Sequence, residues 1–172
     1  MIPKMNGTII TQLNYNNIPQ TWFEGNFDWM IVYGQLKNMS GVHDQKDDVL
    51  VFEEKDETFS TYVYPSKSRE YIMIGSGSTM SSEFSYLSSN SPLDSFKLIQ
   101  ERERGLEYRP YHFDDMFYIS TNIDKSTNFK LVKTPISSPS KSNWEDVIPH
   151  RDDVLLEEVD FFRNFMVIGE RN

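Results

Sequence analysis

Short runs of apolar and aromatic residues alternate with turn-forming linkers along most of this chain. From residue 47 onward the apolar runs include VLVFEE, TFSTYVY, EYIMIGS, EFSYLS, FKLIQE and FMVIGER, and the linkers include PSKSR, SSNSPLDS and TPISSPSKSN. Runs of this length, rich in aromatic and β-branched residues, are typical of strands when Gly, Pro, Ser and Asn separate them. No segment shows the sustained 3.6-residue apolar period of an amphipathic helix. The pattern predicts an all-β fold.

Strands of similar sequence recur at a nearly constant spacing. One set, in which two apolar residues precede a charged turn, repeats every 49 residues at Val49-Leu50, Leu98-Ile99 and Val147-Ile148. A second set, in which an aromatic residue precedes apolar ones, comprises Tyr71–Gly75, Phe117–Thr121 and Phe165–Gly169. A third pairs Glu83–Leu87 with Asn128–Val132. About four strands per repeat, always in the same order, are typical of the blades of a β-propeller.

The repeat divides the chain into blades at about residues 57–100 and 106–148, followed by an incomplete blade at residues 155–172. Val49–Phe52 is expected to be the outer strand of an earlier blade, with a strand over Trp29–Leu36 before it. Residues 1–40 match the repeat poorly and are either an altered start or a divergent blade. Residues 41–172 are therefore predicted to form a partial β-propeller of four-stranded antiparallel blades, about three and a half in number.

An arc of a propeller leaves apolar faces and strand edges uncovered at both ends, because each blade packs between two neighbours in a closed ring. We therefore expect this chain to be part of a larger ring, or to assemble with further copies.

Composition and charge narrow the function classes. The 172 residues include no alanine and 14% aromatic residues, which favours strands over helices. The net charge of −9 argues against a nucleic-acid partner, because binding to phosphates needs a basic face. No apolar run reaches the ~18–20 residues that span a bilayer, so no membrane partner is expected. The absence of cysteine and of a secretory signal at the start favours a cytoplasmic location.

Candidate chemistry is sparse. The sequence HRD at residues 150–152 resembles the catalytic loop of a protein kinase, but that loop needs Asn five residues after its Asp, where Glu157 stands. No two glycines have the spacing of the G-x-S-x-G motif of serine hydrolases. His43, His112 and His150 lie too far apart in the sequence for the usual metal motifs. We therefore predict no catalytic residue, no metal site and no cofactor in this chain.

The charged segment PHRDD is predicted to connect one blade to the next, since QERERGLE and FEEKDETF occupy the same place in the preceding repeats. Within this connector, Arg151, Asp152 and Asp153 are candidates for ion pairs at the interface between blades.

Four longer segments resemble the propeller of the oligopeptidase B branch of the prolyl oligopeptidase family. They are DDVLVFEEKDETF (47–59), SGSTMSSEFSYL (76–87), FYISTNIDKSTNFKLVKTP (117–135) and WEDVIPHRDDVLLEEVDFF (144–162), and the similarity extends over about residues 41–172. The resemblance implies a seven-bladed propeller that caps an α/β-hydrolase domain carrying a Ser, Asp and His triad. It also implies that the propeller restricts access to short peptides, which such enzymes cleave after Arg or Lys.

The resemblance assigns no catalytic or substrate-binding residue to this chain, because the triad lies in the hydrolase domain. The leading hypothesis is a substrate-gating propeller segment that is not hydrolytic alone and whose partners are that hydrolase domain and short, basic peptides. Two alternatives stay open at this point. One is a free-standing propeller-type module for protein interaction, and the other is a non-functional fragment of a split gene.

Overall fold

The computed structural model describes residues 27–32, 35–40, 49–91 and 94–172. Within these residues, thirteen strands form four antiparallel sheets. The only helices described are the 3₁₀ turns Ile123–Lys125 and Lys141–Asn143, and neither is long enough to cross a membrane. The all-β fold predicted from the apolar pattern is therefore confirmed.

Each sheet is built from strands that are consecutive in the sequence. The first sheet has β1 (Phe27–Val32), β2 (Gln35–Ser40) and β3 (Val49–Glu53). The second has β4 (Ser60–Pro65), β5 (Tyr71–Gly77), β6 (Ser82–Ser88) and β7 (Lys97–Gln100). The third has β8 (Tyr108–Phe113), β9 (Met116–Thr121), β10 (Lys130–Pro135) and β11 (Glu145–Ile148). The fourth has β12 (Leu155–Phe162) and β13 (Phe165–Arg171).

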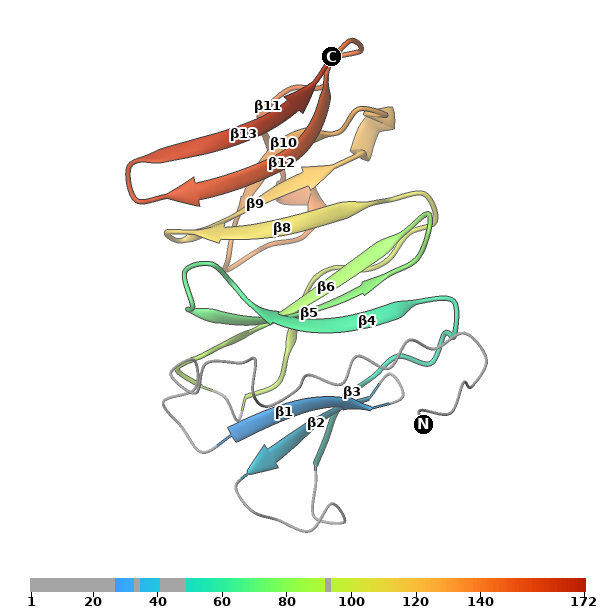
Figure 1. The fold of residues 1–172 in the computed structure, drawn as a ribbon, viewed down its shortest axis with the longest axis vertical. Helices are drawn as coiled ribbons and strands as arrows, with labels where there is room; N and C mark the ends of the chain where they lie inside the picture. The colour runs from blue at the N-terminus through green and yellow to red at the C-terminus, as the bar shows by residue number, and fades with distance from the viewer. Residues whose placement is uncertain (1–26, 33–34, 41–48, 92–93) are drawn as a thin grey trace.

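The four sheets lie one above the other in chain order, from the blue first sheet to the red fourth sheet (Figure 1). The first strands of the last three sheets, β4, β8 and β12, form a row along one side of the stack (Figure 1). Each first strand is hydrogen bonded to a strand of its own sheet on one edge only. Consecutive up-and-down sheets that pack face to face, with their first strands in a row, are the arrangement of propeller blades, so the partial β-propeller is confirmed.

The hydrophobic core lies between the sheets rather than inside one of them. Alternate residues of a strand face opposite sides of its sheet, and both sides are covered in the middle of the stack. In β5, Met73 packs towards the third sheet, whereas Ile72 and Ile74 pack towards β3. In β10, Val132 belongs to the cluster shared with the second sheet and Leu131 to the cluster shared with β12 and β13. The central strands are therefore buried on both faces.

The repeated sequence sets occupy equivalent strands. The 49-residue set lies in the last strands β3, β7 and β11, and the second set in the second strands β5, β9 and β13. The third set lies in β6 and, from Lys130 onward, in β10. The last pair of strands in each of the first three sheets also contains a register shift. The same sequence pattern thus produces the same local structure in each repeat.

One expected strand is wrong. The run Trp29–Leu36 is not one strand, because it belongs to the antiparallel pair β1 and β2, in which Val32 pairs with Gln35. Apolar residues stand on both sides of residues 33 and 34, so hydrophobicity alone gave no sign of a break. Most of the segment 1–40, including Trp22, lies outside the described residues, and whether it is an altered start or a divergent blade stays a prediction.

Candidate functional site

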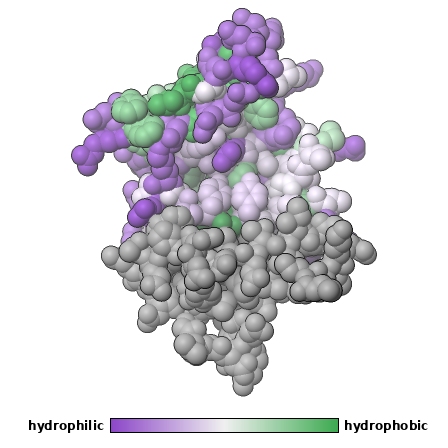
Figure 2. All heavy atoms as spheres, viewed as in Figure 1, coloured by the Kyte–Doolittle hydropathy of each residue, from purple (hydrophilic) through white to green (hydrophobic). Residues whose placement is uncertain are grey.

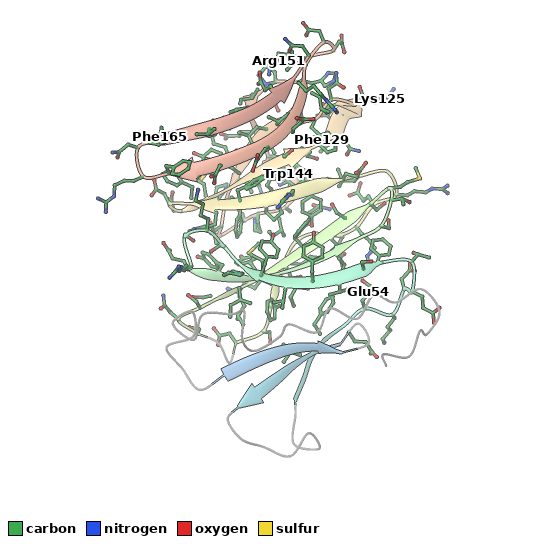
Figure 3. All side chains as sticks on the ribbon, in the orientation of Figure 1. Glu54, Lys125, Phe129, Trp144, Arg151 and Phe165 are labelled. Atoms are coloured by element: carbon green, nitrogen blue, oxygen red, sulfur yellow. The ribbon has the colours of Figure 1, made fainter. Side chains whose placement is uncertain are left out.

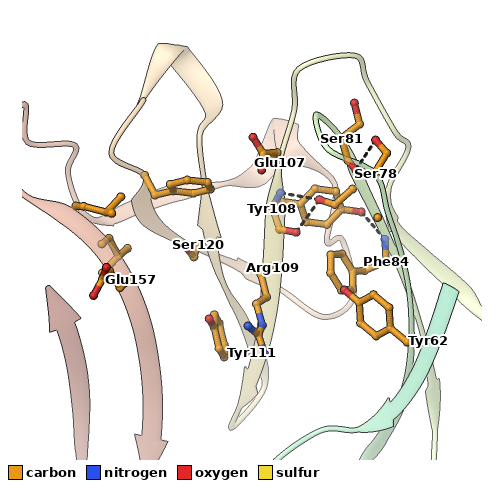
Figure 4. A pocket seen from close by; sticks show the side chains of 15 residues that line it. Tyr62, Ser78, Ser81, Phe84, Glu107, Tyr108, Arg109, Tyr111, Ser120 and Glu157 are labelled. Atoms are coloured by element: carbon orange, nitrogen blue, oxygen red, sulfur yellow. Dashed lines mark hydrogen bonds between the residues drawn. The ribbon is translucent and has the colours of Figure 1, made fainter. Parts of the chain in front are cut away.

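The first strands of three consecutive sheets line an open groove of about 820 Å³. Its walls come from β4, β8 and the start of β12, together with the turn after β5 and the residue Phe129 (Figure 4). First strands face the axis of a propeller, so the groove corresponds to part of the central channel that the complete ring would enclose.

One cation and several tyrosines stand out on the groove wall. Arg109 and Tyr111 alternate along β8, and Tyr62 projects from β4 opposite them (Figure 4). The Arg109 guanidinium carbon lies 5.7 Å from the centroid of the Tyr111 ring. Burial raises the pKa of both Tyr62 and Tyr111, although nearby Arg109 acts in the opposite direction. The two phenols therefore stay protonated at neutral pH and can donate hydrogen bonds.

Strand β8 is fixed firmly against the second sheet. The Ser82 hydroxyl accepts a hydrogen bond from the Tyr108 backbone N–H at 2.7 Å and donates one to the Tyr108 carbonyl oxygen at 2.8 Å. The Tyr108 hydroxyl accepts from the Phe84 N–H at 2.8 Å and donates to the Gln100 carbonyl oxygen at 2.6 Å. The first pair of bonds satisfies backbone groups on the open edge of β8, and the second pair satisfies groups at the register shift between β6 and β7. They hold the wall that carries Arg109 in place.

Phe129 reaches the groove at a conformational cost. Its backbone φ of 60° lies in the left-handed region, which bulky aromatic residues rarely adopt. Its N–H donates to the Ser126 carbonyl oxygen at 2.8 Å, and its side chain packs with the cluster around β12. Such strain costs on the order of 1–3 kcal/mol and persists only where the surroundings enforce it.

A smaller cavity of about 220 Å³ adjoins the groove and shares Arg109 and Tyr111 with it. Tyr64 of β4 lines this cavity, and its buried hydroxyl has no hydrogen-bond partner among the described residues. Burial raises the pKa of Tyr64, so its hydroxyl stays protonated. An ion pair between Lys67, in the turn after β4, and Asp160 of β12 lies at the edge of this cavity.

A serine and a histidine are hydrogen bonded near this cavity. The Ser68 hydroxyl lies 2.6 Å from His112 Nδ1. The His112 side chain is buried beside Tyr71 and Phe117, and burial lowers its pKa. Within the described residues no carboxylate bonds to this ring, so the third member of a hydrolytic triad is lacking. The pair instead ties the β4–β5 turn to β8.

The connector residues singled out in the sequence lie away from the groove. Arg151 pairs with Glu170 of β13, and Figure 3 shows Arg151 at the end of the β12–β13 hairpin opposite to Phe165. The Asp152 side chain is fully exposed and its Oδ1 lies 3.7 Å from His150 Nδ1, while Asp153 is also exposed. Their role in interface ion pairs stays a prediction.

Asn128, which lies between β9 and β10 of the third sheet, forms hydrogen bonds to this connector. Its side-chain amide donates to the Arg151 and Asp152 carbonyl oxygens at 3.1 and 2.8 Å, and its backbone N–H donates to His150 Nε2 at 3.3 Å. The turn between β11 and β12 is therefore held by hydrogen bonds to the hairpin beneath it.

The residues of the groove were not predicted from the sequence. A signal was present, since Tyr62 and Tyr64 alternate in one first strand and Arg109 and Tyr111 alternate in the next. A period of two places such residues on one face of a strand. In the described part of the chain, no three His, Asp or Glu side chains gather in a way that could hold a metal ion.

Comparison with known proteins identifies the family. The model of the family described as prolyl oligopeptidase, N-terminal β-propeller domain, matches residues 42–172. Dipeptidyl aminopeptidase BI of Pseudoxanthomonas mexicana is 40% identical over 124 residues, which are 72% of this chain and 17% of that protein. Protease 2 of Moraxella lacunata is 33% identical over 128 residues, 74% of this chain and 18% of that protein. The chain spans less than a fifth of the length of these two relatives.

A solved structure agrees with the sequence matches. The closed form of oligopeptidase B from Trypanosoma brucei, with covalently bound antipain, is similar with a TM-score of 0.77 at 26% sequence identity. The match covers 85% of this chain and 22% of that one. The resemblance to the oligopeptidase B branch is thereby confirmed. This chain belongs to the prolyl oligopeptidase family and forms part of its N-terminal β-propeller domain.

Proposed function

We propose that this chain walls the substrate chamber of a serine peptidase similar to oligopeptidase B. In this proposal the propeller admits short peptides, and an α/β-hydrolase domain that is not part of the described chain cleaves them after Arg or Lys. The chain itself contributes no catalytic group. We further propose a cytoplasmic location, where short basic peptides would meet its acidic surface of net charge −9.

The observation that carries this proposal is the row of first strands β4, β8 and β12, which lines a polar and aromatic groove. A channel wall has to exclude bulky chains and let small polar ones pass without binding them tightly. Tyrosine rings and serine hydroxyls suit this task, because they offer rigid surfaces and weak hydrogen bonds. Membership of the family supports the link to a peptidase.

A chimera tests the gating role. Residues 42–172 replace the matching segment of Moraxella lacunata protease 2, and the unmodified relative serves as control. We expect both the folded chimera and the control to hydrolyse a fluorogenic Arg dipeptide and to leave unfolded casein uncut. Thermal unfolding checks that the chimera is folded. A folded chimera that cleaves casein as readily as the dipeptide would contradict the proposal.

The isolated chain provides a second test. We expect no hydrolysis of the same Arg dipeptide above the buffer rate, since no described serine has a triad around it. Measurable turnover that follows the chain through purification would overturn the non-catalytic assignment.

One observation favours a second candidate, a module for protein interaction. Phe162 and Phe165 stack at a centroid distance of 4.8 Å, and Phe165 is 60% exposed. Figure 2 shows hydrophobic residues gathered around this hairpin on the visible face. An exposed apolar patch beside an unpaired strand edge is a site for association. Light scattering after size-exclusion chromatography distinguishes the two candidates. A discrete dimer favours the interaction module, whereas a monomer or a polydisperse aggregate favours a propeller segment.

A further inference from the structure

The smaller cavity next to the groove is lined by an exposed arginine, Arg109, and by the buried hydroxyl of Tyr64, which has no hydrogen-bond partner among the described residues. Arg109 lines both the 220 Å³ cavity and the groove, and within the described residues it forms no ion pair. Two neighbouring carboxylates are engaged elsewhere. Asp160 pairs with Lys67, and Glu157 accepts a hydrogen bond from Arg171 Nε at 3.0 Å. An unpaired arginine is unexpected on the wall of a chain that carries 26 acidic and 17 basic residues.

The second donor is the hydroxyl of Tyr64. It lies in the same cavity, buried, with no hydrogen-bond partner in the described part of the chain. Leaving such a group unsatisfied costs about 1–3 kcal/mol. A guanidinium has donors only, so a ligand that satisfies it must bring acceptor oxygens, and the same oxygens can accept from the Tyr64 hydroxyl.

The walls of the cavity indicate what kind of acceptor fits. Tyr111, Pro110 and Phe161 give it aromatic and apolar sides. Its volume exceeds that of one water molecule, which takes about 30 Å³ of liquid. A carboxylate attached to an organic group matches both features, because arginine binds its two oxygens side by side while the apolar wall contacts the rest.

We propose that Arg109 and Tyr64 form a subsite that binds the C-terminal carboxylate of a short peptide in the channel. This inference rests on the proposed function for the source of the peptide. The subsite would also fix the orientation of the bound peptide. With its C-terminus held at this wall, the N-terminal part of the peptide would lie along the groove past Tyr62.

Isothermal titration calorimetry on the full 172-residue chain tests the subsite. The probes are acetyl-Gly-Ser-Phe-Arg with a free carboxylate and the same peptide as its C-terminal amide. The chain is acidic, so nonspecific attraction favours the more positive amide. We expect the free acid to bind about tenfold more tightly, as for a charge-assisted hydrogen-bonded pair.

Matched variants assign the effect to its residues. We expect Arg109→Gln to abolish the preference for the free acid and to leave binding of the amide unchanged. Tyr64→Phe keeps the ring and should weaken binding of the acid about threefold or more, as expected for the loss of one hydrogen bond. Arg163→Gln is the control, because Arg163 is exposed and lines neither cavity. It should bind both peptides like the unaltered chain.

Several results would overturn the subsite. They are equal affinity for acid and amide, an unaltered preference in Arg109→Gln, or no detectable binding of the acid. Displacement by inorganic phosphate as effectively as by acetate, at equal ionic strength, would show a general anion site instead. None of these results affects the casein selectivity of the chimera, so failure of the subsite and failure of the gating role are distinguishable.

Discussion

Arg102 shows how one side chain connects successive repeats. It lies in the connector after β7, with Nη2 2.5 Å from Glu54 Oε2 and 3.0 Å from Glu83 Oε1. Its guanidinium also lies 4.0 Å from the centroid of the Phe59 ring. Burial alone would lower the pKa of Arg102, but the two carboxylates outweigh it and raise the pKa. The connector after β7 is thereby tied to the connector after β3 and to β6.

Replacing Arg102 should destabilise the chain measurably. The Glu54 side chain is only 6% exposed, so Arg102→Met leaves a buried carboxylate without its partner. We expect a loss of about 2–3 kcal/mol in the free energy of unfolding, measured with urea. The control is Lys133→Met, whose ion pair with exposed Glu145 at 3.8 Å should contribute less than about 0.5 kcal/mol. Equal effects of the two variants would contradict this role for Arg102.

His112 should make stability depend on pH. Burial lowers its pKa in the folded chain, so the unfolded chain binds a proton at a higher pH than the folded chain does. Above the pKa of histidine in the unfolded chain, about 6.5, the ring is neutral in both states and burial of His112 does not reduce the free energy of unfolding. As the pH falls below that value, the unfolded chain binds the proton first, and the folded state loses stability. The loss is at most about 1.4 kcal/mol per pH unit.

Thermal unfolding at pH 7.5 and pH 5.5 measures this contribution. We expect the midpoint to fall less between these two values in His112→Gln than in the unaltered chain. An identical fall in both would show that other groups cause the acid sensitivity.

At the scale of elements, Gly75 of β5 illustrates how closely the strands pack. A Cβ placed there would lie 2.5 Å from Tyr62 Cζ and 2.8 Å from Phe84 Cε1. Gly77, two residues further along the same strand, would meet nothing within 4 Å. The missing side chain at residue 75 gives room to the Tyr62 ring, and thereby shapes the groove wall.

Two alanine substitutions compare these positions. Gly75→Ala should destabilise the chain by about 1–3 kcal/mol, because the added methyl group displaces two aromatic rings. Gly77→Ala should change the stability by less than about 0.5 kcal/mol, as is usual at an unobstructed position. Urea unfolding measures both. If Gly75→Ala were as stable as Gly77→Ala, the packing of Tyr62 across β5 would be wrong.

The order of elements could be predicted from the sequence, whereas the groove could not. Strand spacing follows from local apolar runs, and Leu98-Ile99 and Val147-Ile148 lie in equivalent last strands as expected. The groove depends on Tyr62, Arg109 and Leu155, which come from three sheets and lie more than forty residues apart. Local patterns state which residues share a face, but not which faces converge.

At the scale of the whole molecule, the sheets share one architecture but differ in the number of described strands. The second and third sheets have four strands each, and the fourth has two among the described residues. Each interface between the described sheets contains an apolar cluster, so each sheet depends on its neighbours for stability. The family assignment explains this dependence, since the chain corresponds to part of a domain and covers 17–18% of its curated relatives.

Amide hydrogen exchange of the isolated chain, resolved by residue, tests the repeated architecture most directly. The second strands β5 and β9 each have hydrogen-bonded neighbours on both edges and a core on both faces. We expect their amides to exchange at similar rates, on the order of 100-fold more slowly than those of the linkers. The account is contradicted if β9 is protected while β5 exchanges as fast as the linkers.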